Sequence, residues 1–593
     1  MLSENSPAVK IKSFLRDHFL AIVISLCIGL ICVAPHIVFK ISLGNEYKGI
    51  YLTQTSDELA YLARIQEIVD GYWTTGSVPF FEYKNNPPLM PPTALETLIA
   101  GINKFFKISV TNIVIAGKFF LPAIFFLLIY FLVNHLTEKK ESIGNKINAI
   151  AASLLIVLGY DLIDYKSLFS FFYGRGSPEY FLLWTRPSNP ILGGLLIYSF
   201  LLVVWHLYAN REGKNRFGLV FFSGLILALA ITSYFFSWAV ILSIVGLLAI
   251  VGLFKKNFRF FKNLFFMVLT GLILASPYFY NIYLGSKNIF YQESAFRTGL
   301  FLTHEPILNI FLIFSFIIFL ILSFFFKKIV KENIFKEDWW LFSLILILAG
   351  FISFNQQVIT GRTIWPFHFV QYTVPLSITA LFVVFYNLKN KIEKLKGLWG
   401  LLIILIIVSS LSFGIYTQIS VYKKNYEKYK EMQKYADVFG WINKNIKKDC
   451  VILSEDRAFM NQAIPAFTHC NVYFSDFWSF LLPFDRIYYN FLVYLRLEGV
   501  SSDEIENYIK KNTDDILVYL YGTHTMIDYN VADYEDVLKK IATDYKEFLT
   551  KDFEAELKKY RIDYLVSEKK INKNFNNLNL VYGANNIFLY QFK

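Results

Sequence analysis

One stretch of the chain gathers the side chains best able to do chemistry. Asp57 and Glu58 are adjacent, and Glu82 and Lys84 follow in the sequence FFEYKNNPPLMPP. Carboxylates can accept protons, and a cation can stabilise negative charge that develops during a reaction. The prolines around Glu82 and Lys84 stiffen the chain because each fixes φ. A rigid loop that presents two acidic centres and a lysine predicts a functional site.

The acidic pair also has a structural interpretation. Ser56 can cap a helix over residues 56–70, with Asp57 and Glu58 in its first turn, where acids complement the helix dipole. The apolar side chains at helical spacing predict that this helix lies along a membrane surface. Gly71 would end the helix. Both interpretations of the pair stay open at this stage.

The elements that must position this stretch are membrane spans. The 593 residues are 55% hydrophobic, with a mean hydropathy of +0.42. Runs of about 20 apolar residues predict transmembrane helices. We count about eleven runs, near 19–41, 109–136, 147–160, 191–208, 217–234, 236–254, 263–283, 306–326, 339–354, 368–387 and 398–418.

The basic residues predict the orientation of these spans. Lysine and arginine recur in every second loop, beginning with the N-terminal segment, so the positive-inside rule places the N-terminus in the cytoplasm. The net charge of +12 is explained by these loops and does not require a nucleic-acid partner. Four segments then lie on the extracytoplasmic side of the cell membrane: the first loop (residues 42–108), residues 160–190, residues 355–367 and everything after residue 418.

The C-terminal segment, residues 419–593, is more charged than the rest. It reads as alternating helix and strand, with helices over 426–445 and 536–559 and strands at 451–453, 516–521, 564–566 and 587–590. We predict an extracytoplasmic α/β domain behind a transmembrane domain of residues 1–418. Cys450 and Cys470 could pair in an oxidising compartment.

The first loop resembles a family. The chain has a first span, a long loop that opens with Asp57-Glu58, and then Glu82-x-Lys84 before Pro87-Pro88-Leu89. This order of motifs is similar to that of the GT-C superfamily of membrane glycosyltransferases. The likeness is nearest to the protein O-mannosyltransferase and aminoarabinose transferase branch. Two asparagines separate Lys84 from the Pro-Pro-Leu element, which is a departure from that branch.

The resemblance implies an inverting transfer of a sugar from a polyprenyl-phosphate donor to a protein, lipid or glycan acceptor at the outer membrane face. It implies that Asp57 is the general base, that Glu58 and Glu82 complete the acidic set, and that Lys84 meets the donor phosphate. Outer cations would assist in binding that phosphate because arginine binds phosphate through its fork. They are Arg175, Arg186, Arg362 and His368.

A divalent metal such as Mg²⁺ or Mn²⁺ is a further expectation from the superfamily. Asp57 and Glu58 could supply oxygen ligands, with Asp161 or Asp164 as additional candidates.

Two other functions compete with glycosyl transfer. A transporter or flippase of lipid-linked glycans should carry charged residues within its spans and show symmetry between its halves, whereas here Lys118 is the exception among apolar spans. A polymerase or ligase of lipid-linked glycans would concentrate its site in a late outer loop, whereas the acids here lie in the first loop.

Overall fold

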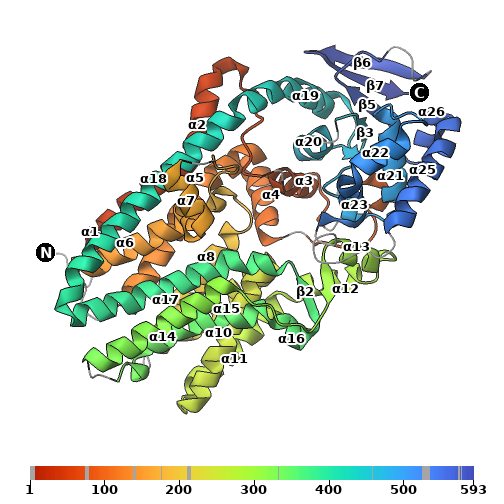
Figure 1. Ribbon diagram of the computed structural model, residues 1–593. Coiled ribbons are helices and arrows are strands. Elements are labelled where there is room, and N and C mark those ends of the chain that lie inside the picture. The colour runs from red at the N-terminus through yellow and green to blue at the C-terminus, as the bar shows by residue number, and fades with distance from the viewer. Residues whose placement is uncertain are drawn as a thin grey trace.

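Every predicted apolar run coincides with a helix or a bent helix pair in the computed structural model (Figure 1). The structure describes residues 7–593 except 56, 74–78, 88, 92, 138–141, 175, 210–215, 331–332, 457–458, 524–533, 572–574 and 576. The helices at the predicted runs are α2 (Phe19–Leu43), α5 (Val110–Leu136), α6 (Ile143–Val157), α8 (Ile191–Ala209), α9 (Arg216–Ile231), α10 (Phe235–Phe254), α11 (Phe258–Leu274) with α12 (Ser276–Gly285), α14 (Ile310–Val330), α15 (Asp338–Phe354), α17 (Val370–Lys391) and α18 (Glu393–Met432).

The number of full-length spans is smaller than the number of runs. Within the described residues, seven helices are long and apolar enough to cross a membrane, or eight if α11 and α12, bent by 53°, form one span. The helices α6, α9 and α15 are apolar but shorter. The polytopic helical fold is therefore confirmed, whereas the count of eleven spans is not.

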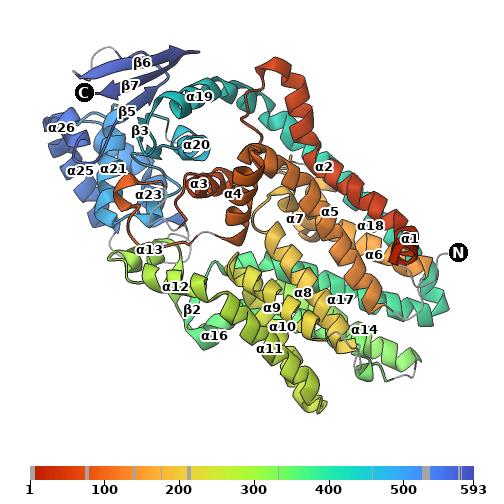
Figure 2. The ribbon, with the colours of Figure 1, turned by 180° about the vertical axis from the view of Figure 1, so that it is seen from behind.

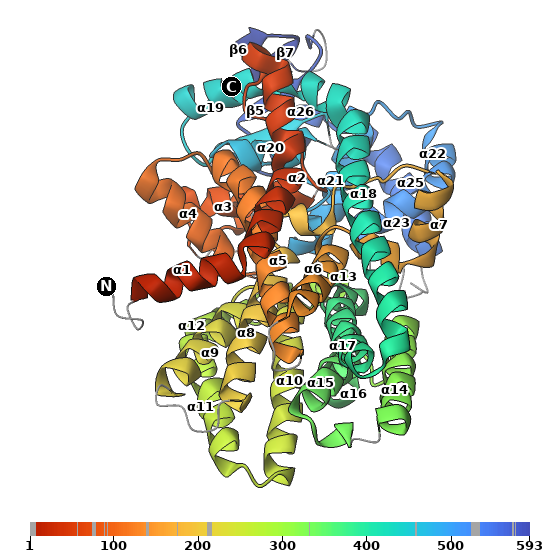
Figure 3. The same ribbon diagram turned by 90° about the vertical axis from the view of Figure 1, so that its left-hand side faces the viewer.

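Short elements fill the connections between these helices, and α1 (Pro7–Asp17) precedes them at a steep angle to α2 (Figure 3). The connecting elements are η1 (Gly44–Glu46), α3 (Asp57–Val69), η2 (Phe81–Tyr83), α4 (Ala94–Phe106), η3 (Tyr160–Ile163), α7 (Tyr165–Tyr173), η4 (Leu183–Thr185), α13 (Tyr291–Arg297), β1 (Leu300–Leu302), η5 (Ile334–Lys336), α16 (Gln356–Thr360), β2 (Arg362–Ile364) and η6 (Pro366–Phe369).

The C-terminal domain, which begins at η7 after the long helix α18, contains the predicted sheet and lies at one end of the molecule (Figures 1 and 2). Its strand order is β4-β3-β5-β7-β6, with β3 parallel to both β4 and β5 and with β7 antiparallel to both β5 and β6. Its elements are η7 (Gln433–Tyr435), α19 (Ala436–Asn445), β3 (Val451–Ser454), α20 (Met460–Phe467), β4 (Asn471–Val472), η8 (Ser479–Leu481), α21 (Phe484–Leu497), α22 (Ile505–Lys511), α23 (Thr513–Tyr521), α25 (Tyr534–Thr550), α26 (Phe553–Leu557), β5 (Tyr564–Ser567), β6 (Leu578–Ala584) and β7 (Ile587–Phe592).

One predicted strand is wrong. Residues 516–521 belong to the helix α23, whose first turn carries Asp514 and Asp515 and whose side chains Ile516 and Leu520 are buried. A short apolar run does not distinguish a strand from a buried helix, and the acids at its start favour the helix.

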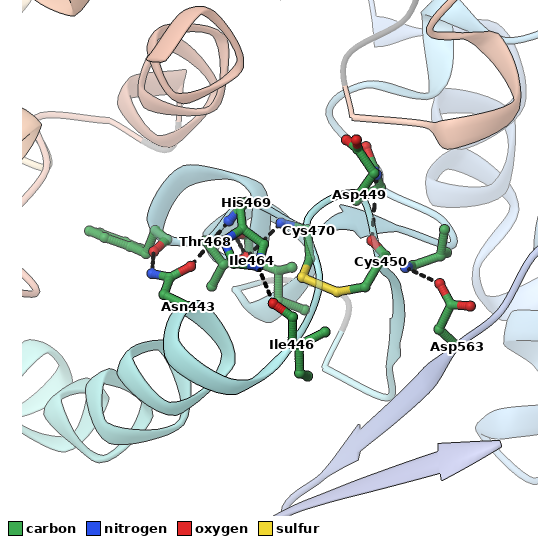
Figure 4. The surroundings of a disulfide bond; sticks show 12 residues. Asn443, Ile446, Asp449, Cys450, Ile464, Thr468, His469, Cys470 and Asp563 are labelled. Atoms are coloured by element: carbon green, nitrogen blue, oxygen red, sulfur yellow. Dashed lines mark hydrogen bonds between the residues drawn. A yellow bond between two sulfur atoms is a disulfide. The ribbon is translucent and has the colours of Figure 1, made fainter. Parts of the chain in front are cut away.

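A disulfide joins Cys450, next to the start of β3, to Cys470, next to the start of β4 (Figure 4). The pairing expected as one alternative from the sequence is therefore present. Asp449, which directly precedes the disulfide, has a left-handed backbone with φ of 64°.

Buried apolar side chains form two separate cores. One core joins the transmembrane helices. The other joins the first loop to the C-terminal domain, so that residues such as Leu59 and Ile65 of α3 pack in one cluster with Ile464 of α20 and Leu565 of β5. The apolar face of α3 is therefore covered by protein, where the sequence predicted a helix lying on lipid. Figures 1 and 2 show α3 and α4 between the bundle and the C-terminal domain from opposite sides.

Candidate active site at the start of α3

The helix α3 begins at Asp57 and ends where Gly71 takes a positive φ of 102°, as predicted. The backbone carbonyl of Thr55 accepts a hydrogen bond from the Glu58 amide and so starts the first turn. Ser56, the predicted cap, lies outside the described residues. Because successive helical residues point in different directions, the two adjacent acids meet different surroundings.

Asp57 faces a buried arginine. Its Oδ2 lies 3.2 Å from Nη1 of Arg186, and the Asp57 side chain is 45% exposed whereas that of Arg186 is 9% exposed. The Arg186 Nε donates to the backbone carbonyl of Asn189, and its guanidinium lies 5.9 Å from the ring centre of Tyr61. Burial lowers the pKa of Arg186, but Tyr61 and Asp57 outweigh that effect, so the guanidinium stays charged. The result is a fixed cation beside an accessible carboxylate.

Glu58 turns inward and is almost fully buried. Its carboxylate lies 2.8 Å from the Lys118 Nζ on α5. It also accepts hydrogen bonds from the Tyr51 hydroxyl and the Gln54 amide, each at 2.8 Å. A carboxylate with this many partners, paired with a fully buried lysine, ties the first loop to the bundle. This arrangement suits a structural ion pair better than a group that reacts with substrate.

Tyr234 joins the site although no sequence motif marks it. Its hydroxyl lies 2.6 Å from Nδ1 of His368, at the start of α17. The Tyr234 ring also lies 6.3 Å from the ring of Tyr372, whose hydroxyl donates to the backbone carbonyl of Pro190, close to Arg186 in the chain. The structure thus places His368, a predicted phosphate ligand, in the same neighbourhood as Asp57 and Arg186. Tyr234 directly precedes α10 in a predicted apolar run, so only the three-dimensional arrangement reveals it.

A second buried ion pair supports α3 from its other side. The Arg64 guanidinium binds the Glu96 carboxylate through Nε at 2.7 Å and Nη2 at 2.9 Å. Glu96 also completes a capping box with Thr93 at the start of α4. This bidentate contact fixes α4 against α3, next to a narrow pocket. The pocket is lined by Glu58, Tyr61, Leu62, Ile65, Thr93, Leu95, Glu96, Ile99, Val114, Pro187, Ser188, Asn189 and Leu192.

Lys84 binds two carboxylates at the opposite end of α3. Its Nζ lies 3.0 Å from Glu67 of α3 and 2.9 Å from Asp449 of the C-terminal domain, and the side chain is 5% exposed. Tyr72 donates to Asp449 and places its ring 4.3 Å from the Lys84 nitrogen. We call Lys84, Glu67, Tyr72 and Asp449 the clasp, because they hold the first loop to the C-terminal domain.

The clasp shifts the pKa values of its acids in opposite directions. Burial raises the pKa of Glu67, which the nearby Lys84 only partly offsets. Burial also raises the pKa of Asp449, but hydrogen bonds from Tyr72 and Lys84 outweigh it and leave the pKa below its ordinary value. Asp70 lies in the same charged region, and burial raises its pKa to about 6.

The remaining predicted residues lie away from these contacts or outside the described chain. Glu82 lies 3.9 Å from the buried Arg486 of α21 and thus faces the C-terminal domain. Arg362 is exposed on β2, which pairs with β1. Arg175 lies outside the described residues. The structure therefore brings Asp57, Arg186 and His368 into one neighbourhood and gives Glu58, Glu82 and Lys84 other partners.

The predicted metal ligands fit a divalent ion poorly. Glu58 is bonded to Lys118, and Asp57 faces Arg186. Among the described residues, no group of three or more His, Cys, Asp or Glu side chains could hold a metal ion. A metal at Asp57 and Glu58 would have to displace a buried lysine, so we derive no step through it.

These features define a polytopic membrane protein with a charged site between its helical bundle and an α/β domain. Neither a scan against protein-family models nor a search of curated proteins finds a match. One solved structure similar to this chain is ArnT from Cupriavidus metallidurans bound to undecaprenyl phosphate. It gives a TM-score of 0.45 at 11% identity and covers 97% of this chain and 97% of that one.

The archaeal oligosaccharyltransferase AglB from Archaeoglobus fulgidus is also similar. Its complex with an inhibitory peptide and a dolichol-phosphate gives a TM-score of 0.42 at 12% identity, covering 93% of this chain and 69% of that one. Its complex with Zn and sulfate gives 0.38 at 14% identity, covering 92% and 67%.

Proposed function

We propose that this protein is a GT-C-type glycosyltransferase that moves a sugar from a polyprenyl-phosphate donor to an acceptor at the membrane surface. The observation that carries the proposal is the accessible carboxylate of Asp57 held 3.2 Å from the buried guanidinium of Arg186. Transfer from a phosphate needs both a base for the acceptor hydroxyl and a cation for the departing phosphate. The resemblance of the first loop supplies the donor class.

In the proposed reaction the acceptor oxygen attacks the anomeric carbon of the donor sugar. The new carbon–oxygen bond forms as the bond from that carbon to the phosphate oxygen breaks, with inversion. Asp57 takes the proton from the acceptor hydroxyl, and the electron pair leaves with the phosphate. Arg186 stabilises this growing negative charge. It uses the guanidinium N–H groups that do not contact Asp57 or Asn189. Tyr234 and His368 are placed to position the donor.

Lys84 and Glu58 have positioning roles in this proposal. Each side chain is buried in an ion pair that anchors one end of α3, Glu58 with Lys118 and Lys84 with Glu67. The two anchors fix the direction in which Asp57 points. A small displacement of a catalytic group costs much of its rate, so such anchors matter to transfer without touching the substrate.

We further propose that the C-terminal domain and the first loop lie outside the cytoplasm. The disulfide between Cys450 and Cys470 supports this orientation because disulfides persist in oxidising compartments. The distribution of lysine and arginine supports the same direction.

A flippase or transporter is the alternative function. The charge of Lys118 within α5 gives this alternative little support, because Lys118 is paired with Glu58 and is fully buried. A transport pathway would instead present such a group to a water-filled cavity.

The proposal is tested with Asp57→Asn in membranes supplied with a radiolabelled polyprenyl-phosphate sugar. We expect transfer to fall by about 100-fold or more, because general-base catalysis typically contributes 10²–10⁴. Asp514→Asn, an exposed acid in the first turn of α23, is the matched control and should keep full activity. Undiminished transfer by Asp57→Asn would remove its role as the base.

A further inference from the structure

The sheet of the C-terminal domain contains a point where the chain changes direction. From β3 the chain passes through α20 to β4 on one side, and after β4 it returns through α21–α26 to β5 on the other side of β3. The strands β3 and β5 are neighbours and parallel. In open α/β sheets, ligands bind in the crevice at the carboxyl ends of strands where the connections diverge in this way.

A cleft of about 220 Å³ lies at this point. It is formed by the residues that follow β3, by the end of β5, and by the adjacent parts of η7, α20 and β7. We call it the switch-point cleft, and its lining residues are Tyr435, Ser454, Glu455, Asp456, Met460, Val566, Ser567, Glu568, Lys569 and Ile587. It is smaller than the roughly 300–1,000 Å³ of pockets for drug-sized ligands, so its ligand is about one or two rings in size.

Two of the acids in the switch-point cleft already have hydrogen-bond or ion-pair partners within the protein. Asp456 accepts hydrogen bonds from the backbone amides of Phe459 and Met460 at the start of α20. Glu568 accepts from the Tyr435 hydroxyl and lies 3.2 Å from the Lys434 Nζ. Lys434 balances the charge of Glu568, whereas the two amides stabilise the Asp456 carboxylate without cancelling its charge.

Glu455 and Lys569 then set the character of the rim. Glu455 uses one carboxylate oxygen to accept from the Ser567 hydroxyl at 2.7 Å. The two residues give the rim one anionic acceptor and one cationic donor, and Asp456 leaves the lining with about one net negative charge. The side chains of Val566 and Ile587 add an apolar floor. A ligand with hydroxyl groups around an apolar face matches this lining, because carboxylates accept from hydroxyls and an ammonium group donates to them. The net negative charge opposes an anion, and among the described residues no group of three or more His, Cys, Asp or Glu could hold a metal ion.

We propose that the switch-point cleft binds a saccharide, and that this saccharide is part of the acceptor. The second half of this inference rests on the proposed function, which it deepens by naming a glycan as the acceptor class. The cleft has a structural route to the active site: Met460 belongs to α20, and α20 packs on α3, the helix that begins with Asp57.

The test uses the full-length protein in detergent and saturation-transfer NMR with soluble di- and trisaccharides of hexoses and N-acetylhexosamines. We expect at least one probe to bind, and Glu455→Gln and Lys569→Met each to weaken it about five-fold or more. Glu498→Gln, an exposed acid outside the cleft, is the matched control and should bind as the wild type does. Two rim variants are used so that misfolding of one leaves the test intact.

Absence of saccharide binding, or binding that both rim variants leave unchanged, would overturn the inference. So would calorimetric binding of calcium or inorganic phosphate that either rim variant abolishes. Asp57→Asn separates this inference from the proposed function, because it should bind saccharide normally while losing transfer. If Asp57→Asn binds saccharide and keeps full transfer, the proposed function alone is wrong. If Asp57→Asn loses transfer and the protein binds no saccharide, the inference about the cleft alone is wrong.

Discussion

The two ends of α3 are both held by buried charges, but they differ in what they leave accessible. At the first end Glu58 is locked to Lys118 while its neighbour Asp57 stays 45% exposed beside Arg186. At the other end the clasp buries Lys84 between Glu67 and Asp449. Only the first end combines an accessible base with a fixed cation. Charge density alone therefore does not identify a catalytic site, and accessibility separates the two ends.

The largest effect is expected from Glu58→Gln, which leaves the Lys118 charge buried without its partner. We expect the free energy of unfolding to fall by about 3–5 kcal/mol, measured by thermal unfolding in detergent. Adding Lys118→Met to Glu58→Gln should restore part of this loss because it removes the unpaired charge. If Glu58→Gln is fully stable and only transfer is lost, Glu58 reacts with substrate and the proposed difference between the adjacent acids is wrong.

A somewhat smaller effect on stability is expected from Lys84→Met, which leaves Glu67 and Asp449 facing each other. We expect a loss of about 3 kcal/mol in the free energy of unfolding because two carboxylates lose their shared cation. Lys444→Met, an exposed lysine of α19, is the control. Unchanged stability with a raised KM for the donor would instead support Lys84 as a phosphate ligand, the role first predicted from the sequence.

Arg186→Lys tests the catalytic end of α3. Lysine keeps the charge but loses the planar fork, so we expect kcat/KM for the donor to fall about 10- to 100-fold. Thermal stability should change little, because the positive charge beside Asp57 is retained. Arg259→Lys, at an exposed position of α11, serves as the control. Equal activity of the Arg186→Lys and wild-type proteins would argue against phosphate recognition by Arg186.

The smallest effect concerns the pH dependence of the clasp region. The pKa of Asp70 is about 6, against an ordinary value of 3.8, because of burial. The folded state therefore holds this proton more tightly than the unfolded state, and stability falls as pH rises from about 4 to about 6. The full shift corresponds to about 3 kcal/mol, but Asp70 is partly exposed and solvent screening reduces the effect. We therefore expect Asp70→Asn to be more stable than the wild type by about 1 kcal/mol at pH 8 and equal to it at pH 4. A gain of the same size at both pH values would contradict this origin.

Much of the fold could be predicted because apolar runs and helix-ending residues are local signals. The helices at the predicted spans, the end of α3 at Gly71, and β3, β5 and β7 all follow from such signals. The sequence does not predict the edge strands β4 and β6, and it assigns residues 516–521 to the wrong element. Local sequence does not decide whether these segments form strands or helices, since tertiary packing decides it.

The site was predicted less completely than the fold. Sequence placed Asp57, Arg186 and His368 on the same face of the membrane, and the structure brings them into one neighbourhood. Sequence could not separate Asp57 from Glu58, because the direction of each side chain depends on where α5 supplies Lys118. It also missed Tyr234 and Asp449, which become relevant only through partners more than 100 residues away.

The shared core of the first loop and the C-terminal domain has a consequence for biosynthesis. The segment with Asp57 leaves the ribosome long before β3 and β5, yet its apolar side chains are buried only when those strands arrive. The first loop therefore stays incompletely folded while the later spans are inserted. A nascent chain that stops before the last domain is made would expose this loop to aggregation and to quality-control proteases. Assembly of the active site therefore requires that synthesis of the C-terminal domain is complete.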